Sequence, residues 1–179
     1  YIPLVCGAEI AIYPEKPGTN IFEHMLTENR ITFIKLTPTH LYMLHDLLYP
    51  GIRLKKFVLG GEQLLTSLAR LIHDTLEGDV KIYNEYGPTE TVVGCMIHQY
   101  DPDADTGYAV PIGKPINNIN IMVLDQYENI LPEGIPGEIY IVGEGIARGY
   151  LNHPELTRQR FILSPFHDKR YMYRSGDIA

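Results

Sequence analysis

Apolar and polar positions follow one another along the first part of the chain in a pattern typical of alternating strands and helices. The pattern predicts strands at residues 8–13, 31–36, 56–59 and 80–83, and helices at residues 21–29 and 66–76. Thr19 or Asn20 can cap the first of these helices, and a further helix begins at Thr37-Pro38, because proline is favoured in the first helical turn. Strands that alternate with helices predict a parallel sheet with flanking helices.

The pattern changes after about Gly107, where short apolar runs are separated by proline, glycine and asparagine. Residues 120–124 and 138–142 are predicted strands. Residues 154–161 are predicted to form one short helix that Asn152 caps and that turns Leu156 and Phe161 inward. We therefore expect an α/β fold, with an α/β subdomain over residues 1–107 and a β-rich subdomain, a small β-barrel or a distorted sheet, over residues 108–179.

Composition limits the possible classes of protein. The chain has 179 residues, of which 45% are apolar and 21% charged, as in ordinary globular domains. A net charge of -7 argues against a nucleic-acid-binding surface, and no apolar run is long enough to predict a membrane span. Cys6 and Cys95 stand alone in apolar surroundings, which favours buried free thiols and a cytoplasmic protein. The histidines lack the spacing of metal ligands.

An apolar strand at residues 80–83 runs into a turn that is rich in polar groups. Gly87-Pro88 breaks the strand, and Tyr86, Thr89 and Glu90 place a flat ring, a hydroxyl and a carboxylate around the break. A nucleotide with its metal ion is a ligand that needs all of these groups. An ordinary strand-turn-strand with Tyr86 in the core is equally compatible with the same residues.

Charged residues also lie near the ends of two predicted strands. In open α/β sheets, ligands bind outside the carboxyl ends of the strands, where Lys35, Gly60 and Glu85 are expected. A lysine or a glutamate is costly to bury alone. Lys35 and Glu85 therefore either face solvent or serve each other and a ligand.

Four segments together resemble one known family. They are residues 59–62 (Leu-Gly-Gly-Glu), 84–91 (Asn-Glu-Tyr-Gly-Pro-Thr-Glu-Thr), 137–151 and 173–177 (Tyr-Arg-Ser-Gly-Asp). Their sequences and order are similar to those of adenylate-forming enzymes, specifically the amino-acid-activating adenylation domains of nonribosomal peptide synthetases. Ser175 stands where that family more often has threonine, and both residues carry a hydroxyl.

The resemblance implies an internal fragment, roughly the second half of the large N-terminal portion of such a domain. The family's phosphate-binding loop would precede residue 1, and its C-terminal lid with the catalytic lysine would follow residue 179. We therefore expect the isolated chain to be inactive, because charge in the transition state would lack its strongest cationic partners.

The resemblance also assigns roles to nucleotide-binding residues. Asn84 would bond the adenine amino group, Tyr86 would stack on the ring, and Asp177 would accept from the ribose hydroxyls. Thr89 would bond the α-phosphate and Glu90 would help to hold Mg²⁺, which makes these two the catalytic candidates. The nucleotide-binding set as a whole is Gly60, Gly61, Glu62, Asn84, Glu85, Tyr86, Gly87, Thr89 and Asp177. A plain turn at Gly61 and a capping role for Asp177 are the competing interpretations.

The family resemblance also assigns six residues to the pocket for the substrate side chain: Lys35, Val58, Gly60, Glu85, Val93 and Gly94. The glycines leave room and the valines form apolar walls. Lys35 can donate to the oxygen of a carboxamide while Glu85 accepts from its NH₂ group. Asparagine is therefore the expected substrate, because aspartate would set a second carboxylate against Glu85.

The implied reaction uses ATP and Mg²⁺ to convert an amino acid to aminoacyl-AMP and pyrophosphate. The aminoacyl group would then pass to the phosphopantetheine thiol of a peptidyl carrier domain, beside other synthetase domains, in secondary metabolite biosynthesis. An acyl-CoA synthetase or luciferase-like enzyme is one alternative, and residues 147–151 and the charged pair argue against it. A non-catalytic interaction domain is the other alternative.

Overall fold

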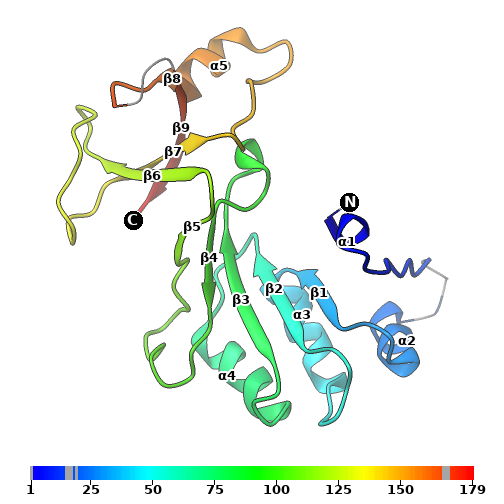
Figure 1. Cartoon of the computed structure of the whole chain (residues 1–179). Helices are drawn as coiled ribbons and strands as arrows, with labels where there is room; N and C mark the ends of the chain where they lie inside the picture. Colours follow the sequence, from blue (N-terminus) through cyan, green and yellow to red (C-terminus); the bar gives the residue numbers. More distant parts are fainter. Residues whose placement is uncertain (1, 15–17, 19, 167–169) are drawn as a thin grey trace. The chain divides into compact units, whose positions relative to one another are not determined.

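The computed structural model describes residues 2–14, 18, 20–166 and 170–179 (Figure 1). The chain divides into two compact units. The first contains Tyr1–Tyr83 and Gln99–Val110, and the second contains Asn84–His98 and Pro111–Ala179. The strand-turn segment at residues 84–91 thus groups with the β-rich part of the chain. The domain boundary expected at residue 107 stays a prediction.

The elements of the first unit alternate as predicted from residue 21 onward. They are α1 (Ile2–Val5), α2 (Ile21–Glu28), β1 (Phe33–Leu36), α3 (Pro38–Leu44), the 3₁₀ helix η1 (His45–Leu47), β2 (Lys56–Gly60), α4 (Thr66–Thr75) and the start of β3 (Lys81–Tyr86). β1 and β2 are parallel, with Lys35 opposite Val58. The five-stranded sheet has the order β1-β2-β3-β4-β5, in which β4 (Met96–Gln99) and β5 (Lys114–Pro115) are antiparallel. The predicted α/β fold is confirmed.

The starts of α2 and α3 follow from side-chain caps. The Asn20 side chain accepts from the backbone amides of Phe22 and Glu23 at the start of α2, whereas Thr19, the alternative cap, lies outside the described residues. At α3, Thr37 Oγ1 accepts from the His40 amide, and Pro38 occupies the first turn. Both side chains satisfy amides that have no partner within the helix.

The strand predicted at residues 8–13 is wrong, because the structure assigns no strand there. Alternating apolar residues form a strand only where a neighbouring strand pairs with the backbone and a core accepts one face. Ile10 and Ile12, on what would be the apolar face, are both exposed. The short helix α1 instead precedes this segment and was not predicted.

The core of the first unit lies among α2, α3, α4 and the strands. Its most deeply buried side chains, all at most 1% exposed, include Leu41, Leu44, Ile52, Leu54, Phe57, Leu59, Leu64 and Ile72. Alternate residues of β2 enter this core while Val58 and Gly60 are only half-buried. The opposite face of β2 therefore carries the two predicted pocket residues of that strand.

The second unit is built on an antiparallel sheet with the order β6-β7-β9-β8 (Figure 1). The strands are β6 (Ile119–Leu124), β7 (Glu138–Gly143), β8 (Phe161–Leu163) and β9 (Tyr171–Ile178), and α5 (Pro154–Arg160) packs beside β8 and β9. β6 and β8 stand at the two ends of this order and β7 pairs with both β6 and β9. Of the two sequence-based alternatives, barrel or sheet, the described strands form an open sheet.

β7 is buried on both faces, because apolar clusters lie on each side of it. Ile139 and Ile141 face a cluster with Cys95, Phe161 and Tyr173. Tyr140 and Val142 belong to a second cluster with Leu124 and Met172. This two-sided burial explains why residues 139–142 are continuously apolar rather than alternating.

Two details of the predicted short helix are wrong. The residue at the N-cap of α5 is His153, without a side-chain hydrogen bond, and Asn152 instead adopts a left-handed backbone with φ +59°. Leu156 is exposed, and only Phe161, which begins β8, is buried. The helix is anchored through Thr157, whose hydroxyl accepts from the Tyr150 amide at 2.9 Å.

The two cysteines differ in environment. Cys95 is a buried free thiol as predicted, and burial raises its pKa. Cys6 is exposed, so that part of the prediction is wrong. Among the helices of the described residues, none has the length and apolar character that crossing a membrane requires.

Candidate functional site

The turn that follows β3 folds back tightly on itself within the second unit. The Cys95 amide donates to the Tyr86 carbonyl at 2.8 Å, and Thr91 donates to the Pro88 carbonyl from both its amide and its hydroxyl. Thr89–Thr91 forms a single 3₁₀ turn, η2. Val92 and Val93 then adopt left-handed φ values of +61° and +73°. Left-handed backbone costs roughly 1–2 kcal/mol for a residue with a side chain, and strained residues of this kind cluster at functional sites.

Gly87 permits this close return of the chain. A Cβ at position 87 would lie 2.6 Å from the Val93 carbonyl oxygen and 2.8 Å from the Cys95 amide nitrogen, both of them backbone atoms. Backbone cannot move aside as a side-chain tip can. The glycine of the motif is therefore required by packing, whatever ligand the turn meets.

We expect Gly87→Ala to lower the free energy of unfolding by about 1–3 kcal/mol, since the added methyl group must displace backbone. Urea denaturation measures the change. Gly107→Ala is the matched control, because its Cβ would meet only the Ala109 carbonyl oxygen at 3.9 Å, and it should change stability by no more than about 0.5 kcal/mol. Equal losses from the two variants would contradict the packing role of Gly87.

Tyr86 and Asp177 meet although they are 91 residues apart. The Tyr86 hydroxyl donates to Asp177 Oδ2 at 2.6 Å. Burial, together with the hydrogen bond to Asp177, raises the pKa of Tyr86, so the phenol stays protonated. The Ser175 hydroxyl shapes the same loop by accepting from the Asp177 amide and donating to the Ile139 carbonyl. Two of the four sequence motifs are thus brought together.

Glu90 joins a third motif to this group. The Tyr150 hydroxyl donates to Glu90 Oε1, and the Ala147 amide donates to the Glu90 carbonyl at 2.7 Å. Burial of Glu90 opposes its ionisation, but hydrogen bonds from Tyr150 and Tyr173 outweigh it and hold the pKa of Glu90 below its usual range. The result is an ionised, half-buried carboxylate with one oxygen fixed by a phenol.

Asn84 is buried at the end of β3, and its Nδ2 donates to the Pro111 carbonyl at 3.0 Å. This bond fixes the orientation of the amide. A ligand amino group at Asn84 would have to be accepted by the opposite atom, Oδ1.

Gly94 makes room for the side chain of Glu85. A Cβ at position 94 would overlap the Glu85 carboxylate and lie 2.9 Å from its Cγ. Glu85 is half-buried, while Val93, which precedes Gly94 in the chain, is exposed. Three of the predicted substrate-binding residues, Glu85, Val93 and Gly94, therefore lie together in the second unit.

The remaining predicted residues lie in the first unit. Lys35 is exposed on β1, and Val58 and Gly60 lie on β2. Gly61 follows with a left-handed φ of +83°, as its interpretation as a turn requires. The pairing of Lys35 with Glu85 stays a prediction from the sequence.

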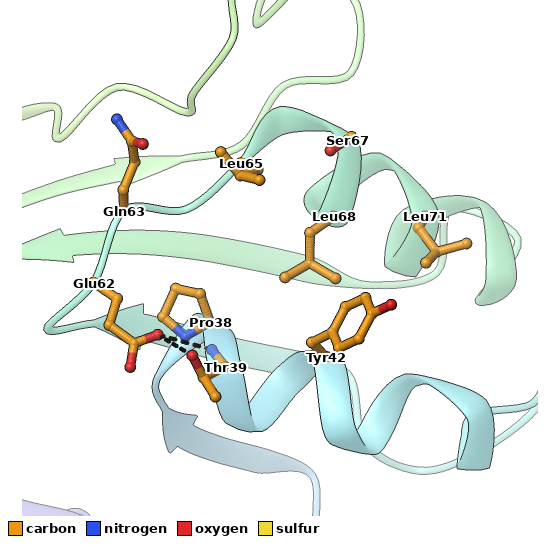
Figure 2. Close-up of a pocket in the computed structure, with 9 residues that line it drawn as sticks. All are labelled: Pro38, Thr39, Tyr42, Glu62, Gln63, Leu65, Ser67, Leu68 and Leu71. Carbon is orange, nitrogen blue, oxygen red and sulfur yellow. Dashed lines mark hydrogen bonds between the residues drawn. The ribbon is translucent and has the colours of Figure 1, made fainter.

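Glu62 binds the start of α3 (Figure 2). Its Oε2 accepts from the Thr39 amide at 2.9 Å and from the Thr39 hydroxyl at 2.6 Å, and these bonds lower the pKa of Glu62. Glu62 also lines a groove of about 390 Å³ between α3 and α4. The residues around this groove are Pro38, Thr39, Tyr42, Glu62, Gln63, Leu65, Ser67, Leu68 and Leu71. Glu62 is the one predicted site residue among them.

Tyr150 and Tyr173 were missed as functional candidates from the sequence. Both lie inside motifs that the sequence reveals, but neither offers a charge or a strand-end position. Only the structure shows that their side chains lie at Glu90. The signal that could have identified them is that they lie in two of the four motifs, at residues 137–151 and 173–177.

The model of the AMP-binding enzyme family matches residues 1–151. The chain belongs to this family. Bacitracin synthase 3 of Bacillus licheniformis is 43% identical over 100% of this chain, which corresponds to 3% of that protein. The chain therefore spans a small part of this relative.

Solved structures agree with the resemblance drawn from the motifs. The adenylation domain AlmE of Vibrio cholerae, in complex with glycyl-adenosine-5'-phosphate, has a TM-score of 0.75 and 26% identity, covering 87% of this chain and 30% of AlmE. PA1221, a nonribosomal peptide synthetase protein with adenylation and PCP domains, has a TM-score of 0.79 and 29% identity, covering 93% of this chain and 34% of PA1221. The predicted membership among adenylation-domain sequences is confirmed.

Proposed function

We propose that this AMP-binding chain is part of a domain that activates an amino acid as its adenylate. The observation that carries the proposal is the meeting of three motifs in the second unit, at the Tyr86–Asp177 and Glu90–Tyr150 hydrogen bonds. In the reaction, a carboxylate oxygen of the amino acid attacks the α-phosphorus of ATP. An O–P bond forms, the bond to the β-phosphate oxygen breaks, and pyrophosphate leaves.

The residues present fit a nucleotide. The Tyr86 ring is a flat surface on which an adenine would stack. Its protonated phenol and the Asp177 carboxylate form a polar pair that would meet the two ribose hydroxyls. Thr89 offers a hydroxyl for the α-phosphate on the exposed side of the turn. Asn84 would accept from the adenine amino group, and Gly60, Gly61, Glu62, Glu85 and Gly87 complete the proposed nucleotide-binding set.

A magnesium ion also fits, provided that the nucleotide supplies ligands. Among the described residues, no group of three or more His, Cys, Asp or Glu side chains could hold a metal alone. Mg²⁺ is usually held by one or two carboxylates together with water and substrate phosphates. Glu90 is an ionised carboxylate of this kind. When bound, the ion would neutralise charge that develops on the phosphate oxygens.

The proposed substrate is asparagine. Gly94 gives the Glu85 carboxylate its space, and Val93 is the exposed residue next to Gly94 in the chain. The family resemblance adds Lys35, Val58 and Gly60 to the same pocket. A lysine donor and a glutamate acceptor match the two ends of a carboxamide. Gly60, together with a Gly94 whose space holds the Glu85 carboxylate, suits a substrate side chain of modest size.

A carrier domain is the proposed acceptor of the activated amino acid. The similarity to PA1221, which contains an adenylation and a PCP domain, supports this partner. The phosphopantetheine thiolate would attack the carbonyl carbon of the adenylate, a thioester would form, and AMP would leave. The similarity to bacitracin synthase 3 supports neighbouring synthetase domains as further partners. We also propose a cytoplasmic location and a role in secondary metabolite biosynthesis.

ATP–pyrophosphate exchange by the complete adenylation domain that contains this chain tests the proposed function. Each amino acid is added separately, with a fatty acid and coenzyme A as the comparison. We expect exchange with amino acids, strongest with asparagine. Exchange only with fatty acids would favour the acyl-CoA synthetase alternative. No exchange with any acid would favour a non-catalytic interaction domain.

A further inference from the structure

Glu90 is held from two sides by the segment that follows β7. The Ala147 amide binds its backbone carbonyl, and the Tyr150 hydroxyl donates to its Oε1. Residues 147 and 150 are about 60 positions from Glu90 in the chain, yet both bonds converge on this one residue. One bond therefore fixes the backbone of the η2 turn, and the other fixes the side chain of Glu90.

The phenol that binds Glu90 is itself held in place. The Tyr150 ring makes an edge contact with Phe161, with ring centroids 5.6 Å apart, and Phe161 lies 5.1 Å from the ring of Tyr173. Phe161 and Tyr173 are about 5% exposed. The Tyr150 amide donates to Thr157 Oγ1, which ties the same residue to α5. The hydroxyl is thus presented by a packed aromatic group, with little freedom to move.

Tyr173 belongs to the same aromatic group, because its ring lies against Phe161. Its side chain is hydrogen-bonded with both the Tyr150 hydroxyl and the Glu90 carboxylate. Tyr173 therefore holds the phenol and the carboxylate together. Tyr150 and Tyr173 come from different motifs, at residues 137–151 and 173–177, so three motifs supply one cluster.

A glutamate side chain has three rotatable bonds, and a metal ligand has to present its oxygen in one direction. Partners that bind the second oxygen of a ligating carboxylate commonly orient it, and their loss lowers metal affinity by about 10–100-fold. A fixed phenol on Oε1 would direct Oε2 toward the ion. We propose that Tyr150, supported by Tyr173, is a positioning residue that sets the Glu90 carboxylate for the cation accompanying the nucleotide. This inference rests on the proposed metal role of Glu90.

Manganese binding gives a readout that does not depend on turnover. The complete adenylation domain is titrated with Mn²⁺ in the presence of a non-hydrolysable ATP analogue, and bound ion is measured by electron paramagnetic resonance. We expect Tyr150→Phe to weaken Mn²⁺ binding about 10-fold. In exchange assays, the half-saturating Mg²⁺ concentration should rise by a similar factor.

Three further variants make the result decisive. Tyr171→Phe is the matched control, because it removes an exposed hydroxyl from the same strand as Tyr173, and it should leave Mn²⁺ affinity unchanged. Tyr173→Phe should weaken Mn²⁺ binding less than Tyr150→Phe and replaces it as the test if that variant does not fold. Glu90→Gln should weaken Mn²⁺ binding most.

The outcomes separate two kinds of failure. Normal Mn²⁺ affinity in Glu90→Gln would overturn the metal role itself and, with it, this inference. Weak binding in Glu90→Gln with normal binding in Tyr150→Phe would overturn only the positioning role. A fall in thermal stability of Tyr150→Phe without a change in Mn²⁺ affinity would also overturn it, since the phenol would then serve the fold alone.

Discussion

Replacing Glu85 by glutamine in the complete adenylation domain is expected to raise aspartate activation sharply relative to asparagine. A site built to hydrogen-bond one substrate group can reject a mismatched analogue by roughly 10,000-fold, and the like charges of Glu85 and aspartate act in the same direction. Glutamine removes the repelling charge but keeps an amide that can accept a hydrogen bond. We expect most of the discrimination to disappear. Pyrophosphate exchange with both amino acids measures the ratio of kcat/KM values.

Lys35→Met extends the test to the other proposed partner. It should depress the activation of both amino acids, because it would leave Glu85 without its proposed counter-charge. Lys56→Met is the matched control, since Lys56 is also an exposed lysine on the adjacent strand, opposite Phe33, and belongs to no proposed site. An unchanged asparagine-to-aspartate ratio in Glu85→Gln, or a wild-type preference for apolar amino acids, would contradict the pocket assignment while leaving the family intact.

Glu90→Ala has the second largest expected effect, a loss of about 100-fold in turnover at limiting Mg²⁺, which is typical of removing one charge-stabilising group. Glu90 lies just past the Gly87-Pro88 break in the sequence, a position that predicts an exposed side chain whose removal costs no stability. In the structure it is half-buried and accepts from Tyr150, and alanine would leave that phenol without its acceptor. We therefore also expect a loss of about 1–3 kcal/mol in the free energy of unfolding.

Glu90→Gln separates these two effects. Its amide oxygen can still accept from Tyr150, so urea denaturation should show a stability close to wild type. The charge is gone, so Mg²⁺-dependent turnover should fall nearly as far as in Glu90→Ala. Normal turnover of Glu90→Gln at limiting Mg²⁺, together with a stability loss in Glu90→Ala, would assign Glu90 a purely structural role.

Local signals in the sequence predicted most of the fold. Thr37-Pro38 marks a helix start that depends on neighbouring residues alone, and the structure places α3 there. The strand predicted at residues 8–13 failed because alternation does not reveal whether a partner strand exists. The prediction that Leu156 is buried was wrong for a related reason, because the inward face of a short helix depends on what packs beside it. In the structure Phe161 is buried and Leu156 is not.

The candidate site was predicted as a set of positions, without its geometry. Motif order indicated Tyr86, Glu90 and Asp177, but a hydrogen bond between residues 91 positions apart depends on how β9 pairs with β7. Tyr150 and Tyr173 could not be assigned for the same reason. Their role depends on side chains that converge only in the folded chain. The roles of all these residues toward a ligand stay predictions.

Direct detection of the adenylate tests the central claim most sharply. The complete adenylation domain is incubated with ATP, Mg²⁺ and asparagine in the absence of a carrier domain, and the acid-quenched mixture is analysed by mass spectrometry. We expect asparaginyl-AMP to accumulate to about one equivalent of enzyme, since the reactive adenylate is protected within the closed site, together with pyrophosphate. The absence of an aminoacyl-AMP with asparagine and with every other amino acid would contradict the account.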